Sequence, residues 1–119
     1  MNQKMNRIAY GLYGEESAVK YLKKHKYKIL ERNYRCILGE VDIIAKKGAY
    51  LVFVEVKART DDRYGLPMEA VDERKQYKLI ALSQYYQKIK RKLDMPIRFD
   101  VVQVLGDDIT LIENAFEPF

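Results

Sequence analysis

Apolar residues recur along the 119-residue chain with two periods, one typical of helices and one typical of strands. Apolar positions three and four residues apart predict two helices, the second starting at Asp72 as its N-cap. Shorter runs rich in valine, isoleucine and aromatic residues predict strands. The expected elements are a helix over 6–25, strands over 27–34, 40–45 and 50–58, a helix over 72–92, and strands over 97–105 and 109–113. This order predicts a mixed α/β fold with helices against a mainly antiparallel five-stranded sheet.

The two helices are predicted from apolar positions near helical spacing, which in the second helix form one apolar stripe. Those of the first helix are Ile8, Leu12, Val19 and Leu22, and those of the second are Leu79, Leu82, Tyr86, Ile89 and Leu93. Gly11 and Gly14 each weaken the first helix by about 1 kcal/mol relative to alanine. We therefore expect these glycines to serve close packing.

Three charged residues stand in apolar strand segments: Asp42 in the second predicted strand, and Glu55 and Lys57 in the third. Glu55 and Lys57 interrupt the run 51–57, whose other residues are leucine, valine and phenylalanine. Such a run is typical of a strand buried on both faces, where unpaired charges are unfavourable. Charges kept in such a strand indicate a function.

The turn between the second and third strands decides whether these charges share a face. Glu55 and Lys57 point the same way because they are two residues apart on one strand. A two- or four-residue loop centred on Lys47-Gly48 would place Asp42 opposite Phe53. It would also place Glu40 opposite Glu55, so that all the polar side chains emerge on one side. A three-residue loop would instead turn Asp42 to the other face.

Two carboxylates beside a lysine suit Mg²⁺ binding, with Mn²⁺ as a substitute, and hydrolysis of a phosphodiester. Mg²⁺ prefers oxygen ligands and needs one or two carboxylates when a substrate phosphate is present. Asp42 and Glu55 are the expected ligands, with the Val56 carbonyl as a third. Lys57 would orient or deprotonate a metal-bound water, or stabilise the transition state. The alternative is a cross-strand salt bridge between Lys57 and either acid at a sheet edge.

Composition predicts one globular domain over residues 1–119, with 48% apolar and 33% charged residues. No apolar stretch approaches the roughly 20 residues of a membrane-spanning helix, and the N-terminus lacks the apolar core of a signal peptide. The single cysteine, Cys36, cannot form an internal disulfide. We therefore expect a cytoplasmic protein with no membrane partner.

The net charge of +5 permits a polyanionic partner such as DNA. Acids set among basic flanks suit a metal site that faces a phosphate backbone. The candidate phosphate contacts, each of which could also be an ordinary surface charge, are Arg32, Arg35, Arg59, Arg74, Lys75 and Lys78. Tyr64 is a candidate for stacking on a base.

The motifs around these charges resemble those of the PD-(D/E)xK nuclease superfamily. Their central part is Gly39-Glu40-Val41-Asp42 followed by Phe53-Val54-Glu55-Val56-Lys57-Ala58-Arg59. The chain is most similar to the YraN-like bacterial proteins, predicted endonucleases related to archaeal Holliday junction resolvases. Val41 replaces the proline of the motif, and Tyr34 stands where tryptophan is common. Further matches are Gly11-x-x-Gly14-Glu15-x-x-Ala18, Asn33-Tyr34-Arg35, Gly65-x-Pro67-x-Glu69-Ala70-Val71, Lys75-Gln76 and Arg98-Phe99-Asp100-Val101-Val102.

The resemblance implies a restriction-endonuclease-like core with Asp42, Glu55 and Lys57 as the catalytic set. It also implies that Glu15 reaches the metal or its waters, although helical spacing alone does not distinguish Glu15 from its neighbour. By the same resemblance, Gln76 approaches the scissile phosphate. Many resolvase-like nucleases dimerise to cut two strands, so the resemblance also favours a homodimer.

The preferred hypothesis is a metal-dependent endonuclease that hydrolyses DNA phosphodiester bonds, in branched or otherwise structured DNA. Two alternatives stay open. One is a nucleic-acid-binding module that has the nuclease fold but does not cleave. The other is a protein-interaction scaffold in which the charged residues form salt bridges.

Overall fold

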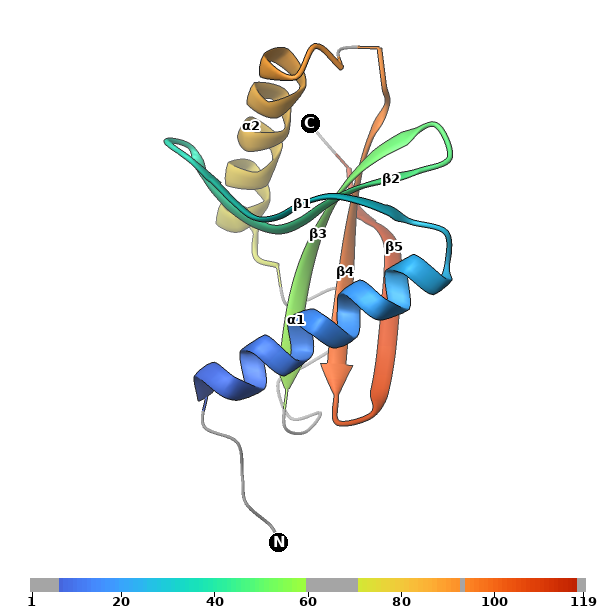
Figure 1. Cartoon of the computed structure of the whole chain (residues 1–119). Helices are drawn as coiled ribbons and strands as arrows, with labels where there is room; N and C mark the ends of the chain where they lie inside the picture. The colour runs from blue at the N-terminus through green and yellow to red at the C-terminus, as the bar shows by residue number, and fades with distance from the viewer. Residues whose placement is uncertain (1–6, 60–70, 93, 118–119) are drawn as a thin grey trace, which may run out of the picture.

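Seven elements follow one another in the predicted order of helix, three strands, helix and two strands (Figure 1). The computed structural model describes residues 7–59, 71–92 and 94–117, so Tyr64, the 65–70 part of the motif and Leu93 lie outside the described residues. Neither described helix is long and apolar enough to cross a membrane. The elements are α1 (Arg7–Lys24), β1 (Lys28–Cys36), β2 (Gly39–Lys47), β3 (Tyr50–Arg59), α2 (Glu73–Ile89), β4 (Ile97–Leu105) and β5 (Asp108–Phe116).

The strands form one sheet in the order β1-β2-β3-β4-β5. β3 and β4 pair in parallel, and the other three neighbouring pairs are antiparallel. A parallel pair needs a crossover connection, and α2 lies between β3 and β4 in the chain for this reason. The parallel strands β3 and β4 are both largely buried, which explains their nearly continuous apolar sequences. The prediction of a mixed, mainly antiparallel five-stranded sheet flanked by helices is confirmed.

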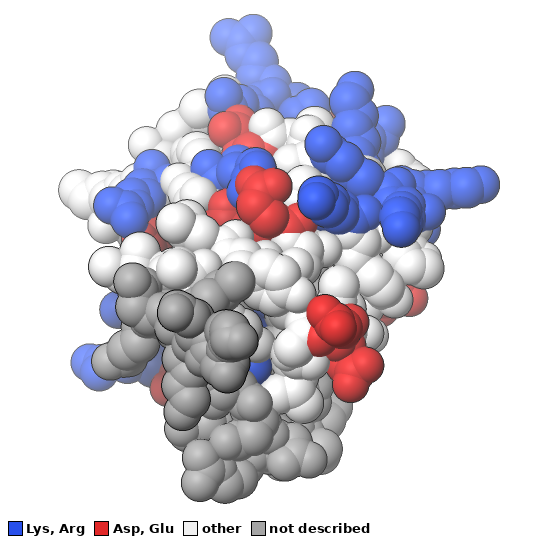
Figure 2. Space-filling model, turned by 60° about the horizontal axis from the view of Figure 1, so that its bottom comes forward, with Lys and Arg blue, Asp and Glu red and all other residues white. Residues whose placement is uncertain are grey.

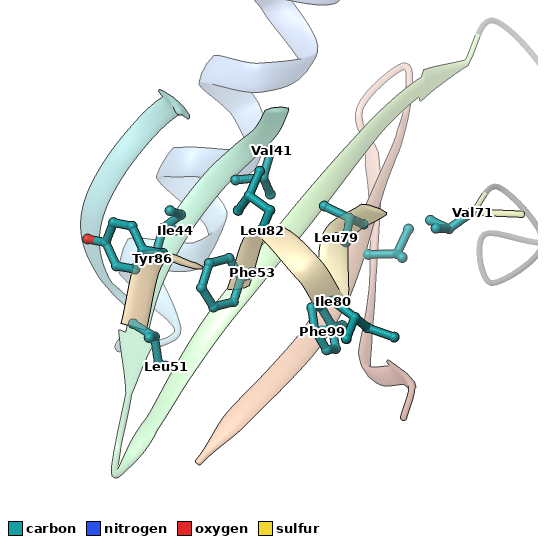
Figure 3. Close-up of a cluster of buried hydrophobic side chains, with 11 residues drawn as sticks. Val41, Ile44, Leu51, Phe53, Val71, Leu79, Ile80, Leu82, Tyr86 and Phe99 are labelled. Atoms are coloured by element: carbon teal, nitrogen blue, oxygen red, sulfur yellow. The ribbon is translucent and has the colours of Figure 1, made fainter. Parts of the chain in front are cut away.

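α2 covers one face of the sheet with the apolar stripe expected from the sequence (Figure 3). Leu79, Leu82 and Tyr86 are buried there. The ring of Tyr86 meets that of Phe53 edge-on, with centroids 5.8 Å apart. Ile89 is 50% exposed, so the stripe stops contacting the sheet at the last residue of the helix.

α1 covers the opposite face, but with only the second half of its predicted apolar positions. Val19 and Leu22 are buried in a second core cluster. Ile8 and Leu12 also have helical spacing but are 78% and 61% exposed, so this spacing confirms the helix without indicating burial at its start. Figure 1 gives the reason, because the first turns of α1 project beyond β3 in that view.

The two glycines of α1 have different roles. A Cβ atom on Gly14 would lie 2.7 Å from the Cβ of Ala58 on β3, so the close packing predicted for this glycine is confirmed. A Cβ atom on Gly11 would meet nothing within 4 Å, so the same prediction is wrong for Gly11.

The β2–β3 hairpin has the predicted loop parity but a different register. Lys47 pairs with Tyr50 across the two-residue loop Gly48-Ala49. Phe53 pairs with Ile44, so the predicted pairing of Phe53 with Asp42 is wrong by two residues. The strand continues through Lys47 and turns only at Gly48, which has a φ of +59°. Because the loop has two residues, the alternation of side chains is preserved.

An irregularity between β4 and β5 is held by a buried carboxylate. Asp100 is 1% exposed and accepts two hydrogen bonds from Arg98, at 3.0 Å each. It also accepts one from the Tyr27 hydroxyl at 2.7 Å and one from the Asn114 backbone N–H at 2.9 Å. The register shifts between Phe99 and Val101 at this point. Asp100 therefore binds a backbone N–H beside the shift in the β4–β5 pairing.

Candidate functional site

The candidate site lies where β2 and β3 separate, a place that we call the fork. Their pairing runs from the loop as far as Ile43 and Val54. A continued ladder would bring Val41 opposite Val56, but the Val56 N–H instead donates to the Asp42 carboxylate at 2.7 Å. The carboxylate thus satisfies a backbone donor that the diverging strand leaves without a ladder partner.

Glu55 is the second acid of this fork and is only 5% exposed. Its side chain lies toward α2, where Lys75 Nζ is 3.7 Å from its Oε2 atom. Burial, followed by the negative charge of Asp42, raises the pKa of Glu55 to about 7. Lys75, Lys57 and a hydrogen bond from the Asp42 backbone lower this pKa, but they do not offset the increase.

The pKa of Asp42 is raised as well. Burial is the largest cause, opposed by the hydrogen bond from Val56, and the charge of Glu15 raises the pKa further. Lys75 and Lys57 act in the opposite direction. The negative charge of Asp42 therefore disfavours ionisation of Glu55, that of Glu15 disfavours ionisation of Asp42, and a cation beside these acids would reduce this cost.

A pocket of about 430 Å³ opens beside this fork on the α1 side. Asp42 and Lys57 both line it, and so does Glu15. The rest of its lining is mostly apolar and includes the exposed start of α1. The lining residues are Ile8, Gly11, Leu12, Glu15, Asp42, Val56, Lys57 and Ala58. Two of the three central charged groups are therefore accessible from one opening.

The four polar residues expected on one side of the sheet have different surroundings in the described part of the chain. Asp42 and Lys57 face the pocket beside α1, whereas Glu55 contacts Lys75 of α2. Glu40 is exposed and forms an ion pair of 3.1 Å with Arg35. The predicted pairing of Glu40 with Glu55 is wrong, because the β2–β3 pairing ends at Ile43 and Val54 and Glu40 lies toward the β1–β2 turn.

Glu15 lies close to the site, but its carboxylate already has partners. Arg32 donates to Oε1 from two nitrogens, at 2.9 and 3.2 Å, and Asn33 donates to it at 3.0 Å. Arg32 also pairs with Glu16 at 2.7 Å, so this predicted phosphate contact is engaged by acids of α1. Within the described ranges no three acid, histidine or cysteine side chains are arranged to hold a metal. A metal here would depend on Asp42 and Glu55, and two carboxylates are sufficient for Mg²⁺ when a substrate supplies further oxygens.

Three of the predicted phosphate contacts gather in a second pocket, of about 400 Å³, between α2 and the β1–β2 turn. They are Arg35, Lys75 and Lys78. Cys36, Gly39 and Glu40 complete its lining. Because Lys75 also reaches Glu55, this basic pocket borders the acidic fork.

The remaining predicted residues lie at element ends. Arg74 is exposed in the first turn of α2, and Arg59 ends β3. The side chain of Asp72 accepts from the Lys75 N–H at 2.9 Å, which confirms the predicted N-cap. Gln76 donates to the Val71 carbonyl at 3.0 Å and so supports the start of the same helix.

Charged side chains of both signs lie close together on one face of the surface (Figure 2). Figure 2 shows a face on which a small central group of acidic side chains is bordered by Lys and Arg side chains. This arrangement agrees with the expectation of acids among basic flanks. Opposite charges so arranged create a local field that favours a cation and a phosphate together.

The fold and the fork define a class: a mixed α/β protein with one buried and one half-buried carboxylate, and lysines near them, at the end of a paired strand. The chain belongs to the family described as "Uncharacterised protein family UPF0102", whose sequence profile matches residues 14–104. It is 49% identical to a UPF0102 protein of Clostridium acetobutylicum over 96% of this chain and 98% of the relative. Similar relatives occur in Lachnoclostridium phytofermentans, at 47% identity over 97% and 98%, and in Caldicellulosiruptor saccharolyticus, at 48% over 94% and 100%.

Sequence reasoning missed two contacts of the site. The first is the bond from the Val56 N–H to Asp42, since Val56 was considered only for its carbonyl. The second is the approach of Lys75 to Glu55. The position of Lys75 in the first turn of α2 was a usable signal, because that helix leads from β3 back to the sheet.

Proposed function

We propose that this protein is a metal-dependent endonuclease that hydrolyses phosphodiester bonds of branched or otherwise structured DNA. The observation that carries the proposal is the fork between β2 and β3, where Asp42 lies close enough to raise the pKa of the buried Glu55 and Lys57 lowers the pKa of both acids. Burying two acids together is unfavourable unless a cation or a proton compensates. A divalent cation would compensate the negative charge and would also enable these residues to support hydrolysis of a phosphodiester.

Each of the three residues has a role in this proposal. Asp42 and Glu55 hold Mg²⁺ or Mn²⁺, which when bound lowers the pKa of a water and neutralises charge on the phosphate. Asp42 has one oxygen engaged by Val56 and a second one available. Lys57 lines the accessible pocket, where it can orient the attacking water and stabilise charge on the phosphate.

Two further observations support DNA as the substrate. The residues Asp42, Glu55 and Lys57 fall on the motif that resembles the PD-(D/E)xK nucleases, here within a YraN-like pattern. The pocket formed by Arg35, Lys75 and Lys78 supplies three cations next to the acids. A phosphate backbone bound in this pocket would pass the fork, because Lys75 lines the pocket and also contacts Glu55 of the fork.

The test is a cleavage assay on a panel of four-way junctions, flaps and linear duplexes of one sequence, with Mg²⁺, Mn²⁺ or EDTA. Asp42→Asn keeps the shape of the side chain but removes its charge. Asp108→Asn is the matched control, since Asp108 is exposed at the β4–β5 turn. We expect metal-dependent cleavage by the wild type and by Asp108→Asn, and loss of at least about 100-fold in Asp42→Asn.

The same assay separates the other functions. Binding to DNA without cleavage in any metal would identify a nucleic-acid-binding module. Absence of both binding and cleavage would contradict a role in DNA metabolism and leave the protein-interaction scaffold. Equal cleavage by Asp42→Asn and wild type would contradict the assigned site.

A further inference from the structure

The β1–β2 hairpin ends in two apolar residues that the fold does not use. Cys36 pairs with Gly39, so Ile37 and Leu38 form the two-residue loop. Ile37 is 91% exposed and Leu38 is 41% exposed. Figure 1 shows this hairpin extending past α2 to a free tip. Residues at such turns are typically glycine, asparagine, aspartate or serine, so the apolar pair is unusual.

The backbone of this turn does not require isoleucine and leucine. Gly39 takes the positive φ angle, at +138°, while Ile37 and Leu38 have negative φ angles. The Ile37 side chain contributes little burial to the protein itself, whereas Leu38, at 41% exposed, is partly covered. The stability of the hairpin therefore depends on Gly39 and on the strand pairing, and the side chains at the tip are available for a partner.

The surroundings of the tip indicate the chemistry of that partner. Cys36 and Gly39, which flank the two apolar residues, line the pocket that contains Arg35, Lys75 and Lys78. A partner on the tip therefore contacts a basic surface beside it. Apolar side chains next to cations match a nucleic acid, whose phosphates meet the cations while its bases meet the apolar tip.

We propose that Ile37 and Leu38 form an apolar wedge that inserts between bases of DNA at a branch or a distortion. This inference rests on the proposed nuclease function and names how the substrate is selected. Proteins that insert isoleucine or leucine between base steps must unstack them. Unstacking is least costly where bases are already mismatched or unpaired, so the wedge favours branched DNA over a regular duplex.

The distance from the tip to the fork fits a single bound substrate. Leu38 precedes Asp42 by four residues in the hairpin, which corresponds to about 13 Å at about 3.3 Å per strand residue. With a rise of about 3.4 Å per base pair, this is about four base steps. The wedge therefore predicts cleavage about four steps from the point where the bases separate.

The test measures binding in Ca²⁺ in place of Mg²⁺, with the full chain and a four-way junction that carries 2-aminopurine near its branch. A linear duplex of the same sequence is the reference. The variant is the double substitution Ile37→Ser and Leu38→Ser, and its melting temperature is compared with that of the wild type. Ile89→Ser is the matched control. Ile89 is an apolar residue that is 50% exposed, and it is the last residue of α2, at the opposite end of the helix from Lys75.

We expect the wild type to bind the junction more tightly than the duplex and to increase the fluorescence of 2-aminopurine as it unstacks. The double variant should bind the junction about tenfold more weakly, keep its duplex affinity and lose the fluorescence increase. The control Ile89→Ser should behave like the wild type.

The outcomes that overturn the wedge are distinct from failure of the proposed function. If the wild type cleaves DNA but the double variant keeps junction preference and fluorescence, the wedge alone is wrong. If the wild type neither binds nor cleaves any DNA, both ideas are wrong. If the double variant instead converts a dimer to a monomer in sedimentation, with DNA binding unchanged, the tip is a self-association surface and the wedge is overturned.

Discussion

The Asp42 carboxylate accepts a hydrogen bond from the backbone N–H of Val56, 2.7 Å away across the fork between β2 and β3. This bond fixes one carboxylate oxygen at the point where the strands separate. It favours the ionised form of Asp42, although burial raises the pKa more. In the proposed function, the second oxygen would bind the cation.

A first prediction concerns pH in the absence of metal. The pKa of Glu55 is raised in the folded protein from its ordinary value of 4.5 to about 7. The contribution of this group to stability is therefore fully present below pH 4.5 and is lost as the pH rises through about 7. Glu55→Gln should remove this part of the pH dependence, measured by urea unfolding in EDTA from pH 5 to pH 8. Glu40→Gln, an exposed acid, is the control, and an unchanged slope in Glu55→Gln would contradict the assignment.

A second prediction concerns the metal itself. Mg²⁺ should stabilise the wild type at pH 8, by about 2.7 kcal/mol at a concentration 100 times its Kd. Asp42→Asn and Glu55→Gln should each abolish this stabilisation, because either change removes one of two carboxylate ligands. The measurement is the melting temperature against Mg²⁺ concentration. Equal stabilisation of all three proteins would mean that the cation binds elsewhere.

A third prediction uses the two glycines of α1. Gly14→Ala should destabilise the protein by about 1–3 kcal/mol, since the new Cβ atom would lie 2.7 Å from that of Ala58. Gly11→Ala has open space at the same helix and should stabilise the protein by up to about 1 kcal/mol. Chemical unfolding of both variants checks the prediction, and equal effects would show that α1 does not pack closely on β3.

A fourth prediction concerns Asp100, which lies away from the fork and has a structural role. Asp100→Asn should cost about 3 kcal/mol of unfolding free energy, because the partly buried Arg98 guanidinium would keep only the more exposed Glu113 carboxylate as an ion-pair partner. Burial and the hydrogen bond to Asp100 raise the pKa of Tyr27, so its hydroxyl stays protonated and keeps donating. Removing the surface ion pair with Arg35→Gln should cost no more than about 1 kcal/mol. Similar losses for both variants would contradict the role assigned to Asp100.

Local patterns predicted much of this fold. The strand Ile97–Leu105 has the expected bounds because its apolar run is continuous and a turn follows at Gly106. The cap at Asp72 was predictable because the side chain satisfies an N–H of its own helix. The acids Asp42 and Glu55 stood out because they interrupt apolar strands.

Features that depend on distant packing were not predictable in the same way. Ile8 and Leu12 have helical spacing, but periodicity does not reveal that α1 extends beyond the sheet. The register of the β2–β3 hairpin depends on the position of its turn. The turn lies at Gly48-Ala49, one residue later than the expected centre at Lys47-Gly48. The partners of Glu15 come from β1, so no pattern within α1 indicates them.

The central claim is that Asp42, Glu55 and Lys57 form a metal-dependent nuclease site, and single-turnover cleavage of a four-way junction tests it most directly. Lys57→Ala is compared with wild type and with Lys46→Ala, an exposed lysine of β2. We predict Mg²⁺-dependent cleavage by wild type and Lys46→Ala, no cleavage in EDTA, and a rate at least about 100-fold lower in Lys57→Ala with binding retained. Cleavage by Lys57→Ala at the wild-type rate, or no cleavage by the wild type in Mg²⁺ or Mn²⁺, would contradict the account.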